Sequence, residues 1–525
     1  MGKHFDPGNA GFKEALNSYY VDKTGLIELI NRSINTKIKL TCISRPRRFG
    51  KSFAAQMLCA YYDCTCDSHE LFDQYEISKA DTYEEHMNQY HVISLDITGF
   101  LSEVKSEKGD ISDVPKMIAD ALQNELVQEY SDLAGISGLT NSLLEYVKKT
   151  GRKIIFVIDE WDALIREAKH DEVTQEAYLN FLRSLFKNND FTPHAVAAAY
   201  MTGILPIKKD GSQSAISDFQ EYSILDPNGF ADYTGFTEED VKCICNDYSM
   251  GFAKAKQWYD GYNAGEVGSI YNPYSVMMAM TRKKYGSYWK KTSAAEALTT
   301  YINMNYEGLQ EDIVRLIAGE TLEINTDDFE NDFETFISKD DVLTLMIHLG
   351  YLAYDEETGS IRIPNEEVRG EFTSLIRKAD TNKLAELIRT SNQLLSDTLA
   401  GDNDAVAKAI GKICMTEYAP NFYNNEQALR YVIKFAYIVC VDKYKKVEKL
   451  PSGKGIADVV FLPKRNTPDP AMVVELKWNK TSEAAISQIK EKNWSSRNDT
   501  NSFWCSVLSR SSAADIKRSR KQSVP

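Results

Sequence analysis

The sequence predicts an α/β protein whose N-terminal part is built on a parallel β-sheet, and three observations support this fold class. The run KIKLTCIS has the alternation of a strand, and the helical pattern of KSFAAQMLCAYYD follows it. Five successive apolar residues, Ile154 to Ile158, suit a strand that is buried on both faces of a parallel sheet. Two more strands are predicted in HVISLDI, from His91, and in HAVAAAYMTGI, from His194.

The length of the chain and its cysteines limit which class of protein it can be. A chain of 525 residues is too long for one ordinary domain, and two to four domains are expected. The nine cysteines are scattered, which is typical of reduced thiols in a cytoplasmic protein. Two C-x-C pairs leave a zinc site open as an alternative, although zinc sites more often use C-x-x-C spacing. No signal peptide and no apolar run of about 20 residues is present, so we expect no membrane partner.

The charge is distributed unevenly along the chain. Residues 441–525 contain 17 basic and nine acidic residues, a net charge of +8, whereas the rest of the chain carries −23. A basic C-terminal module on an acidic body is a candidate for contact with a polyanion such as nucleic acid. A solvated basic face with a charged tail is the alternative interpretation of the same pattern.

The stretch SRPRRFGKSFAA lies between the first predicted strand and its helix, where a phosphate-binding loop would lie. Gly50 would allow the turn, Lys51 would reach the β- and γ-phosphates of a nucleotide, and Ser52 would hold Mg²⁺. The usual pattern G-x-x-x-x-G-K-[ST] places a further glycine where this chain has Arg45. The alternative is an arginine-rich loop that happens to contain Gly-Lys-Ser.

Two carboxylates follow the apolar run of the second predicted strand. The carboxyl ends of parallel strands form the edge at which open α/β sheets bind ligands. We expect Asp159 to coordinate Mg²⁺ and Glu160 to polarise the water that attacks the nucleotide. A strand that ends in a solvated acidic turn is the alternative. Thr202 ends another predicted strand, where it could contact the γ-phosphate or simply cap the strand.

The middle of the chain changes to a mostly helical pattern from about residue 226. The aromatic clusters WYDGYN and IYNPYSV are expected to pack in a core rather than to stack on a ligand. A helix at Asp340–His348, the strands YLAYD and SIRIP, and a helix from PNEEV outline a winged helix. Winged helices bind nucleic acid or couple domains. The acidic turn between the two strands would repel phosphate, which favours coupling.

The last region contains two strand patterns that could hold a metal ion. ADVVFLP and AMVVELKW are separated by turn-forming residues and predict a hairpin, with Asp458 and Glu475 on adjacent strands. The period of a strand places Glu475 and Lys477 on one face. Two carboxylates that bind Mg²⁺ and a lysine near the nucleophile suit phosphodiester cleavage. An ordinary Glu–Lys surface pair is the alternative.

Segments along almost the whole chain resemble one family. They are YYVDKTGLI, RPRRFGKS, VIDEWDALI, TGILPIKK, YSILDP, GFTEEDV, WYDGY, YNPYSV, LGYLAYD, IPNEEV and GKGIADVVFLP. The chain resembles the bacterial AAA-ATPase-like family that carries a C-terminal PD-(D/E)XK nuclease-like domain. That family writes the loop as RPRRFGKS, so the resemblance implies that the first glycine is dispensable. We expect the arginines of the loop to replace the lost amide contacts with charge.

The resemblance implies a P-loop ATPase domain at residues 1–225, a helical and winged-helix region at 226–400 and a restriction-endonuclease-like α/β domain at 401–525. The implied cofactors are ATP and Mg²⁺. The implied nucleotide-binding residues are Arg47, Arg48, Gly50, Lys51, Ser52, Phe53, Asp159 and Thr202, with Glu160 as the catalytic residue. The implied nuclease residues are Asp458, Glu475, Lys477, Gln488 and Glu426.

The predicted function is an ATP-hydrolysing protein coupled to a Mg²⁺-dependent nuclease that acts on nucleic acid, DNA above all, with defence against foreign DNA as one setting. The alternative is an NTP-driven signalling or nucleic-acid-binding protein whose nuclease fold is inert. A homo-oligomer is compatible with either. After Trp494 the chain departs from the family and becomes rich in Ser and Arg, and only SFWCSVL could form the further apolar strand that the family has there. We therefore expect a nuclease domain with a trimmed or altered end.

Overall fold

The computed structural model describes residues 2–207, 216–263, 265–289, 308–317, 319–327, 329, 338–378, 383–414, 433, 436–438, 440–452, 455–464, 469–477, 504–509 and 515–520. The chain divides into two compact units. One comprises residues 1–290 and 323–368, and the other comprises residues 291–322 and 369–525. Within the described residues, no helix is long and apolar enough to cross a membrane.

The first unit is built on a five-stranded sheet in the order β2-β3-β4-β1-β5, in which every neighbouring pair is parallel. The strands are β1 (Leu40–Ser44), β2 (His91–Asp96), β3 (Ile154–Asp159), β4 (Val196–Gly203) and β5 (Gln220–Tyr222). The prediction of a parallel α/β sheet is thus confirmed. His194 was placed in a strand by the sequence, but it belongs to the helical turn α11 (Thr192–Ala195), and β4 begins two residues later. The edge strand β5 was not predicted.

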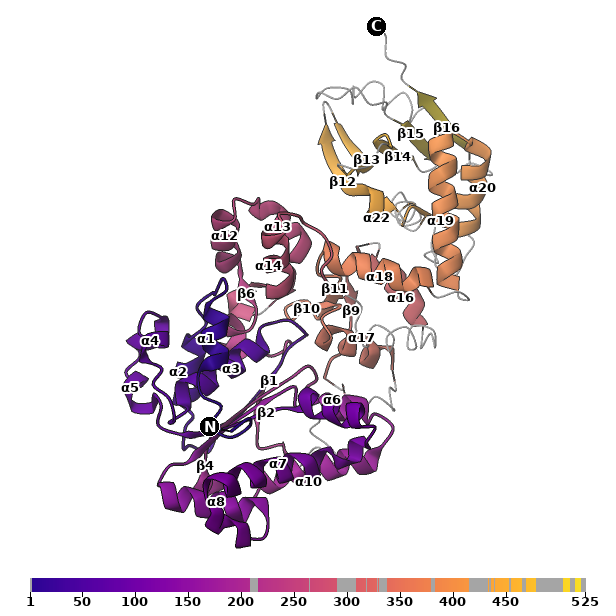
Figure 1. Ribbon diagram of the computed structural model, residues 1–525. Coiled ribbons are helices and arrows are strands. Elements are labelled where there is room, and N and C mark those ends of the chain that lie inside the picture. Colours follow the sequence, from indigo (N-terminus) through magenta and orange to yellow (C-terminus); the bar gives the residue numbers. More distant parts are fainter. Residues whose placement is uncertain are drawn as a thin grey trace. The chain divides into compact units, whose positions relative to one another are not determined.

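Helices cover both faces of this sheet (Figure 1). One layer contains α1 (Ala10–Leu16), α2 (Gly25–Asn31) and α3 (Lys51–Tyr62). The other contains α6 (Ile97–Glu107), α7 (Val114–Glu129), α8 (Leu139–Thr150) and α10 (Glu172–Phe186). Short helices complete the unit at α4 (His69–Phe72), α5 (Tyr83–His86) and α9 (Ala163–Glu167).

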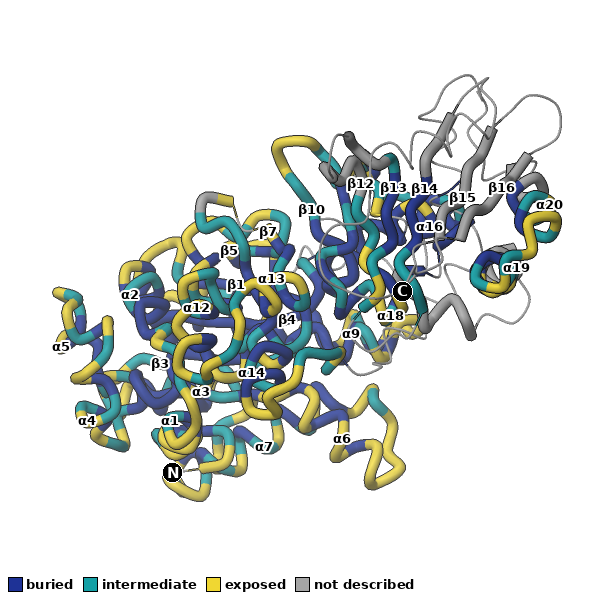
Figure 2. The backbone as a smooth tube through the Cα atoms, turned by 90° about the horizontal axis from the view of Figure 1, so that it is seen from above, coloured by how far each residue is buried: buried dark blue, intermediate teal, exposed yellow. Residues whose placement is uncertain are grey.

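The central strand β3 shows why its sequence is continuously apolar. Ile154, Phe156 and Ile158 belong to one hydrophobic cluster, whereas Ile155 and Val157 belong to the cluster on the other face. Successive side chains of a strand point to opposite faces, so a strand between two helical layers needs apolar residues at every position. Buried backbone therefore runs through the middle of this unit in Figure 2.

A smaller helical part follows the sheet. It contains α12 (Glu238–Asp247), α13 (Phe252–Tyr259), α14 (Pro273–Thr281) and a small sheet in the order β6-β8-β7, formed by β6 (Phe236–Thr237), β7 (Tyr262–Asn263) and β8 (Ser269–Tyr271). Tyr259, Tyr271 and Val276 are buried in one cluster here, and Trp258 packs against it. The expectation that the aromatic segments form a core is confirmed.

The winged-helix outline also appears as a helix, a hairpin and a second helix. α17 (Lys339–His348) begins at a capping box in which Ser338 accepts from the amide of Asp341. β10 (Ala353–Asp355) pairs antiparallel with β11 (Ser360–Arg362), and α18 (Glu366–Lys378) follows. β9 (Leu322–Glu323) lies next to β11.

The second unit contains a mixed sheet in the order β12-β13-β14-β15-β16. The strands are β12 (Tyr444–Ser452), β13 (Gly455–Pro463), β14 (Met472–Lys477), β15 (Trp504–Ser509) and β16 (Asp515–Arg520). The helices are α16 (Leu309–Ile317), α19 (Lys383–Ala400), α20 (Asn403–Cys414) and α22 (Cys440–Lys443). The predicted hairpin is the antiparallel pair β13–β14, and β15 pairs parallel with β14. The segment SFWCSVL, which the sequence offers for the further strand, supplies β15, and β16 follows it. The expectation of an altered end stays a prediction.

Candidate functional site

Three strands bring the predicted nucleotide-binding residues to one edge of the first sheet. β4 lies between β1 and β3, with Ile43 opposite Thr202 and Ile158 opposite Met201. All three strands run in the same direction, so the loops that follow them meet at the carboxyl edge of the sheet. This topology places the Gly-Lys-Ser loop, the acidic pair and Thr202 in one region, as the sequence predicted.

The loop between β1 and α3 has the backbone of an anion-binding turn. Gly50 is the residue before α3 and has a φ of 86°, in the left-handed region that favours glycine. Arg48 also has a positive φ, 70°. Gly50 has no side chain with which to cap α3, so the N-cap residue leaves the first amides of the helix without a side-chain acceptor. Ser52 and Phe53 lie exposed on this first turn, where the sequence expects contacts to Mg²⁺ and nucleotide.

Lys51 is held against its own loop. Its side chain is 4% exposed, and Nζ donates to the carbonyl oxygens of Arg45 at 3.0 Å and of Pro46 at 3.1 Å. Nζ also lies 3.5 Å from Oε1 of Glu160. The lysine therefore connects the loop after β1 to the acidic pair after β3.

The acidic pair is fixed by Thr202. The hydroxyl of Thr202 donates to Oδ1 of Asp159 and accepts from the backbone amide of Glu160 at 3.3 Å. Glu160 has a φ of 53°, which turns the chain sharply after the strand. Thr202 is fully buried. Its single proton is used by Asp159, so in this state Thr202 positions the acidic pair rather than offering a free hydroxyl to a phosphate.

Arg166 completes the group and was not predicted from the sequence. Its Nη2 lies 2.6 Å from Oε2 of Glu160, and its Nε lies 2.9 Å from Oδ2 of Asp162. Burial lowers the pKa of Arg166, but the carboxylates of Asp162 and Glu160 raise it more, so the net shift is upward. The available signal was the spacing of Asp162 and Arg166, four residues apart on a helix.

Asp162 is the next carboxylate after Glu160 in the sequence, but its position does not suit the role of a general base. It is 1% exposed, and its Oδ2 accepts from the backbone amides of Ile204 and Leu205 at 3.2 and 3.0 Å. A carboxylate with these fixed partners holds the turn after β4 and anchors Arg166.

The three loop arginines have different surroundings, and the expectation that all replace lost amide contacts is wrong for Arg45. Arg45 is 4% exposed and donates to Thr234 and to the carbonyl oxygens of Ser44 and Tyr222. Burial lowers its pKa to about 10. Arg45 thus fills the position of the missing glycine by turning into the protein, where it bonds the neighbouring segments.

Arg48 and Arg47 also differ from each other. Arg48 donates to the carbonyl oxygen of Tyr288 at 2.8 Å and stacks over the ring of Tyr274, with 4.2 Å to the centroid. Within the part of the chain that the structure describes, the guanidinium of Arg47 has no hydrogen bond or ion pair. Burial and the nearby Arg166 lower the pKa of Arg47. Arg47 is therefore the loop arginine available to an anion.

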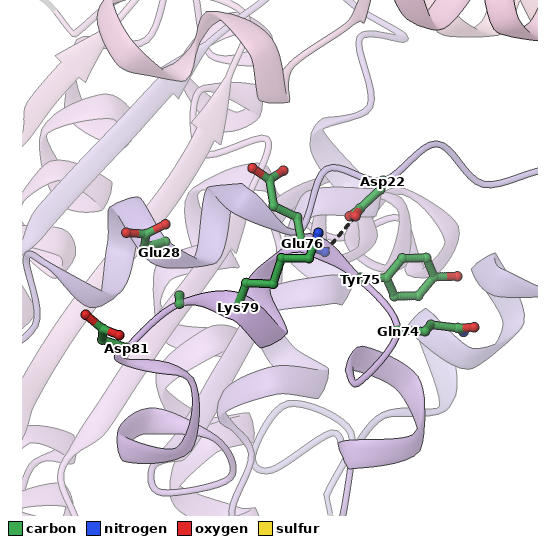
Figure 3. A pocket seen from close by; sticks show the side chains of 8 residues that line it. Asp22, Glu28, Gln74, Tyr75, Glu76, Lys79 and Asp81 are labelled. Carbon is green, nitrogen blue, oxygen red and sulfur yellow. Dashed lines mark hydrogen bonds between the residues drawn. The ribbon is translucent and has the colours of Figure 1, made fainter.

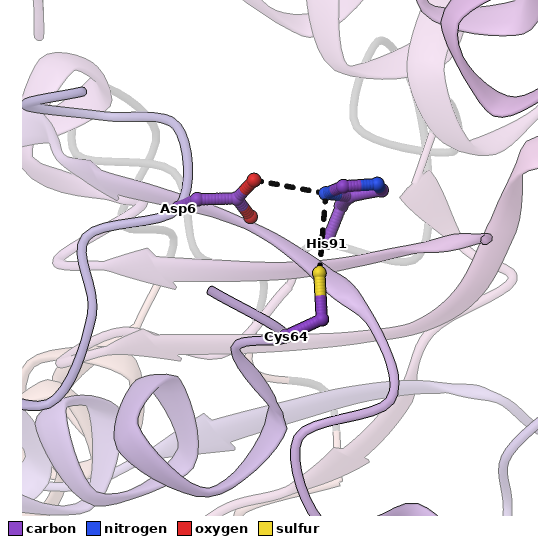
Figure 4. A group of neighbouring side chains, drawn as sticks. All are labelled: Asp6, Cys64 and His91. Atoms are coloured by element: carbon purple, nitrogen blue, oxygen red, sulfur yellow. Dashed lines mark hydrogen bonds and ion pairs between the residues drawn. The ribbon is translucent and has the colours of Figure 1, made fainter. Parts of the chain in front are cut away.

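A second polar group lies at the opposite, amino-terminal edge of the same sheet (Figure 4). Oδ2 of Asp6 lies 2.8 Å from Nδ1 of His91, and the Cys64 thiol and Tyr146 hydroxyl lie 3.5 and 3.1 Å from the same nitrogen. Asp, Cys and His are the residue types that bind zinc. However, a zinc-binding histidine normally donates its other N–H to a partner, and Nε2 of His91 is buried without one among the described residues.

We therefore describe Asp6, Cys64, His91 and Tyr146 as a hydrogen-bonded tie. Residues near the N-terminus pair with β2 through Phe5 and Ile93, and Oδ1 of Asp6 accepts from the amide of Val92 at 2.8 Å. Cys66, the other member of its C-x-C pair, lies instead against Ser68. The tie holds the N-terminal segment to the edge strand.

Four of the eight residues that line an open cavity beside α2 are acidic (Figure 3). The lining residues are Asp22, Glu28, Gln74, Tyr75, Glu76, Lys79, Ala80 and Asp81. None of them belongs to the predicted nucleotide site, and carboxylates of this density repel phosphate. The cavity is therefore not a candidate for nucleotide binding.

In the second unit, the predicted nuclease residues are placed in part. Val459 of β13 lies opposite Val474 of β14. Asp458 precedes Val459 on β13 and Glu475 follows Val474 on β14, so these two residues lie on adjacent strands. Lys477 is the last residue of β14. Gln488 and Glu426 lie outside the described residues.

A comparison of the sequence with known protein families gives one match. Residues 12–212 match the AAA-ATPase-like family, described as "Predicted AAA-ATPase". The match covers the AAA-ATPase-like segment from α1 to just beyond β4, which contains Lys51, Glu160 and Thr202. A search among curated proteins gives no match. A solved structure of the Aeropyrum pernix ORC2 protein, in ADPNP–ADP complexes, aligns over 69% of this chain and 96% of that chain, with 10% identity and a TM-score of 0.31.

Proposed function

We propose that the AAA-ATPase-like segment binds ATP at the carboxyl edge of its sheet and hydrolyses it. The observation that carries this proposal is the joint placement of Lys51, Glu160 and Asp159, from two loops more than 100 residues apart. The match of residues 12–212 to a predicted AAA-ATPase supports it. The first amides of α3 and the side chain of Lys51 would bind the β- and γ-phosphates.

The oxygen donors of the site fit Mg²⁺. The exposed hydroxyl of Ser52 and the carboxylate of Asp159 are hard oxygen ligands of the type that this ion prefers. When bound, Mg²⁺ neutralises charge on the phosphates. Thr202 would keep Asp159 in position, and Glu160 would accept a proton from the attacking water. Arg47 would approach the phosphates from the loop.

The experiment is nucleotide binding and turnover by the full chain and by Lys51→Ala. Removing a charge-assisted phosphate contact worth about 1.5–3 kcal/mol should weaken ATP binding about 10- to 150-fold. Calorimetric titration with ATP and Mg²⁺ measures the affinity, and phosphate release measures turnover. Equal affinity and turnover in both proteins would show that the site lies elsewhere.

We also infer a nuclease role for the second unit, coupled to the ATPase and acting on DNA or RNA in the presence of Mg²⁺. The observation that favours it is the register of β13 and β14. Val459 lies opposite Val474, so the neighbouring residues Asp458 and Glu475 lie on adjacent strands. Glu475 and Lys477 are two residues apart on β14. The excess of basic residues at 441–525 would attract the phosphate backbone. A cytoplasmic location and a homo-oligomer remain predictions.

The nuclease role is tested with plasmid and single-stranded substrates. Asp458→Ala and Lys477→Ala should each abolish cleavage and leave ATP hydrolysis unchanged, because the two sites belong to different units. Both variants should still bind nucleic acid, with an affinity that falls as salt rises. If the unaltered protein binds nucleic acid but never cleaves it with any divalent metal and nucleotide, the inert-fold alternative is correct.

A further inference from the structure

The carboxylate of Glu160 lies between two cations at the carboxyl edge. Its Oε1 is 3.5 Å from Nζ of Lys51, and its Oε2 is 2.6 Å from Nη2 of Arg166. The exposed fractions of these side chains are 4% for Lys51, 19% for Glu160 and 17% for Arg166. An anion therefore already occupies the space in front of the lysine that is expected to hold the terminal phosphates.

Arg166 does not depend on Glu160 for its position. Its Nε is held at 2.9 Å by Asp162, which two backbone amides fix in turn. The far end of the guanidinium can thus exchange one acceptor for another while Nε keeps its partner. A planar guanidinium with several N–H donors is suited to such an exchange between a carboxylate and a phosphate.

The surroundings favour a more strongly charged anion than a carboxylate. Lys51, Arg166 and Arg47 converge on this region, and Arg47 has no ion pair among the described residues. A γ-phosphate carries more negative charge and more acceptor oxygens than a carboxylate, so it forms stronger charge-assisted hydrogen bonds with the same cations. ADP has no γ-phosphate and would leave the pair of Glu160 and Arg166 intact.

We propose that Glu160 holds the place of the ATP γ-phosphate in the nucleotide-free protein, and that Arg166 is the residue that binds this phosphate when ATP enters. The proposal rests on the ATPase function proposed above and adds the means by which ATP is distinguished from ADP. The γ-phosphate takes Lys51 and Arg166 as partners and displaces the Glu160 carboxylate. Glu160 is then released toward the attacking water only when ATP is present.

The test compares the affinities for ADP and for a non-hydrolysable β,γ-imido analogue of ATP in the full chain. Calorimetry with Mg²⁺ gives both affinities for the unaltered protein, Arg166→Gln and Glu160→Gln. Arg166→Gln should weaken binding of the analogue at least 10-fold, the lower end expected for one charge-assisted contact, and leave ADP binding within twofold. Glu160→Gln should strengthen binding of the analogue several-fold, because an amide competes less well for the two cations, and leave ADP binding unchanged.

Arg183→Gln is the matched control. Arg183 lies exposed on α10, and the substitution removes the same charge without touching the site, so both affinities should stay as in the unaltered protein. If Arg166→Gln is not folded by circular dichroism, Arg166→Lys replaces it. A lysine keeps the charge but lacks the planar fork whose Nε and Nη2 reach Asp162 and the position of the Glu160 carboxylate separately, so the analogue should still bind more weakly while ADP does not.

The outcomes distinguish a failure of this proposal from a failure of the ATPase function. Equal losses of ADP and analogue affinity on changing Arg166 would mean that Arg166 only maintains the structure, and no loss for either would mean that it does not reach the γ-phosphate. Either result, or an unchanged analogue affinity in Glu160→Gln, overturns the proposal while the ATPase function stands. If the unaltered protein binds neither nucleotide, the ATPase function itself fails.

Discussion

The two edges of the five-stranded sheet each hold a group of polar side chains, but the groups differ in access and in charge. At the amino-terminal edge, Asp6 and His91 are 2% and 6% exposed, and they form a pair within one hydrogen-bonded tie. At the carboxyl edge, Glu160 and Arg166 are 19% and 17% exposed, and a further cation, Arg47, stands beside them. The first group is closed, whereas the second is more open and contains a cation, Arg47, that has no ion pair among the described residues.

This difference follows from what each edge must do. A closed pair resists change, because removing one partner leaves the other buried and uncompensated. An open pair is a poor source of stability, since solvent weakens it, but it can exchange partners when a ligand enters. An ion pair that can exchange partners, beside free backbone donors, therefore indicates a binding site better than burial or residue type alone.

The largest effect is expected at the open edge, for Glu160→Gln. The amide cannot accept a proton from water, so ATP turnover should fall about 10²- to 10⁴-fold, the usual range for loss of a general base. Nucleotide should still bind. Single-turnover phosphate release measures the chemical step. Normal turnover would show that the base is another residue, and the fixed partners of Asp162 make that residue a poor candidate.

At the closed edge, Asp6→Ala should destabilise the protein without weakening ATP binding. It removes the buried acceptor of the His91 ring and of the Val92 amide, and each buried group left without a partner costs about 1–3 kcal/mol. The free energy of unfolding by urea measures the loss, and nucleotide affinity at low temperature is the control. A loss of affinity in the folded variant would contradict the separation of the two edges.

The contrast between the edges also shows how far the sequence predicts this molecule. The positions of β1, β3 and the acidic pair follow from local patterns, and a parallel sheet necessarily brings their carboxyl ends together. The spacing of Asp162 and Arg166 is a local signal for their own pair, but the contact of Arg166 with Glu160 follows from no local pattern. It depends on the positive φ of Glu160, which turns the chain so that two side chains six residues apart meet.

Other features could not be predicted because they depend on contacts between residues that are distant in the sequence. Arg45 was read as part of a phosphate-binding loop, but its guanidinium bonds Tyr222 and Thr234, which are distant in the sequence. The tie likewise joins residues 6, 64, 91 and 146, which share no spacing rule. In the second unit, alternation predicted the hairpin, whereas Gln488 and Glu426 lie outside the described residues, so their roles stay predictions.

A moderate effect is expected for Thr202→Val, which keeps the shape of the side chain and removes the hydroxyl. Asp159 and the amide of Glu160 each lose a partner in a partly buried position, where an unsatisfied group costs at most about 1–3 kcal/mol. Turnover should fall about tenfold or more. ADP should bind as before, since Thr202 contacts the acidic pair and not the loop that is proposed to bind the β-phosphate. Equal losses for ADP and turnover would indicate general disruption of the sheet edge.

The smallest effect concerns the reactivity of Cys64, and it tests whether the amino-terminal edge is closed. Burial, with a further contribution from the charge of Asp6, raises the pKa of the Cys64 thiol to about 12. The thiolate is the reactive form, so native Cys64 should react with iodoacetamide at pH 8 far more slowly than the exposed Cys243. Mass spectrometry of peptides after timed labelling measures both rates. Labelling of Asp6→Ala should then be faster at Cys64 alone, because loss of the tie exposes that thiol while Cys243 is unaffected. Equal rates for the two cysteines in the unaltered protein would mean that the edge is open, and the contrast between the two edges would then rest on charge rather than on access.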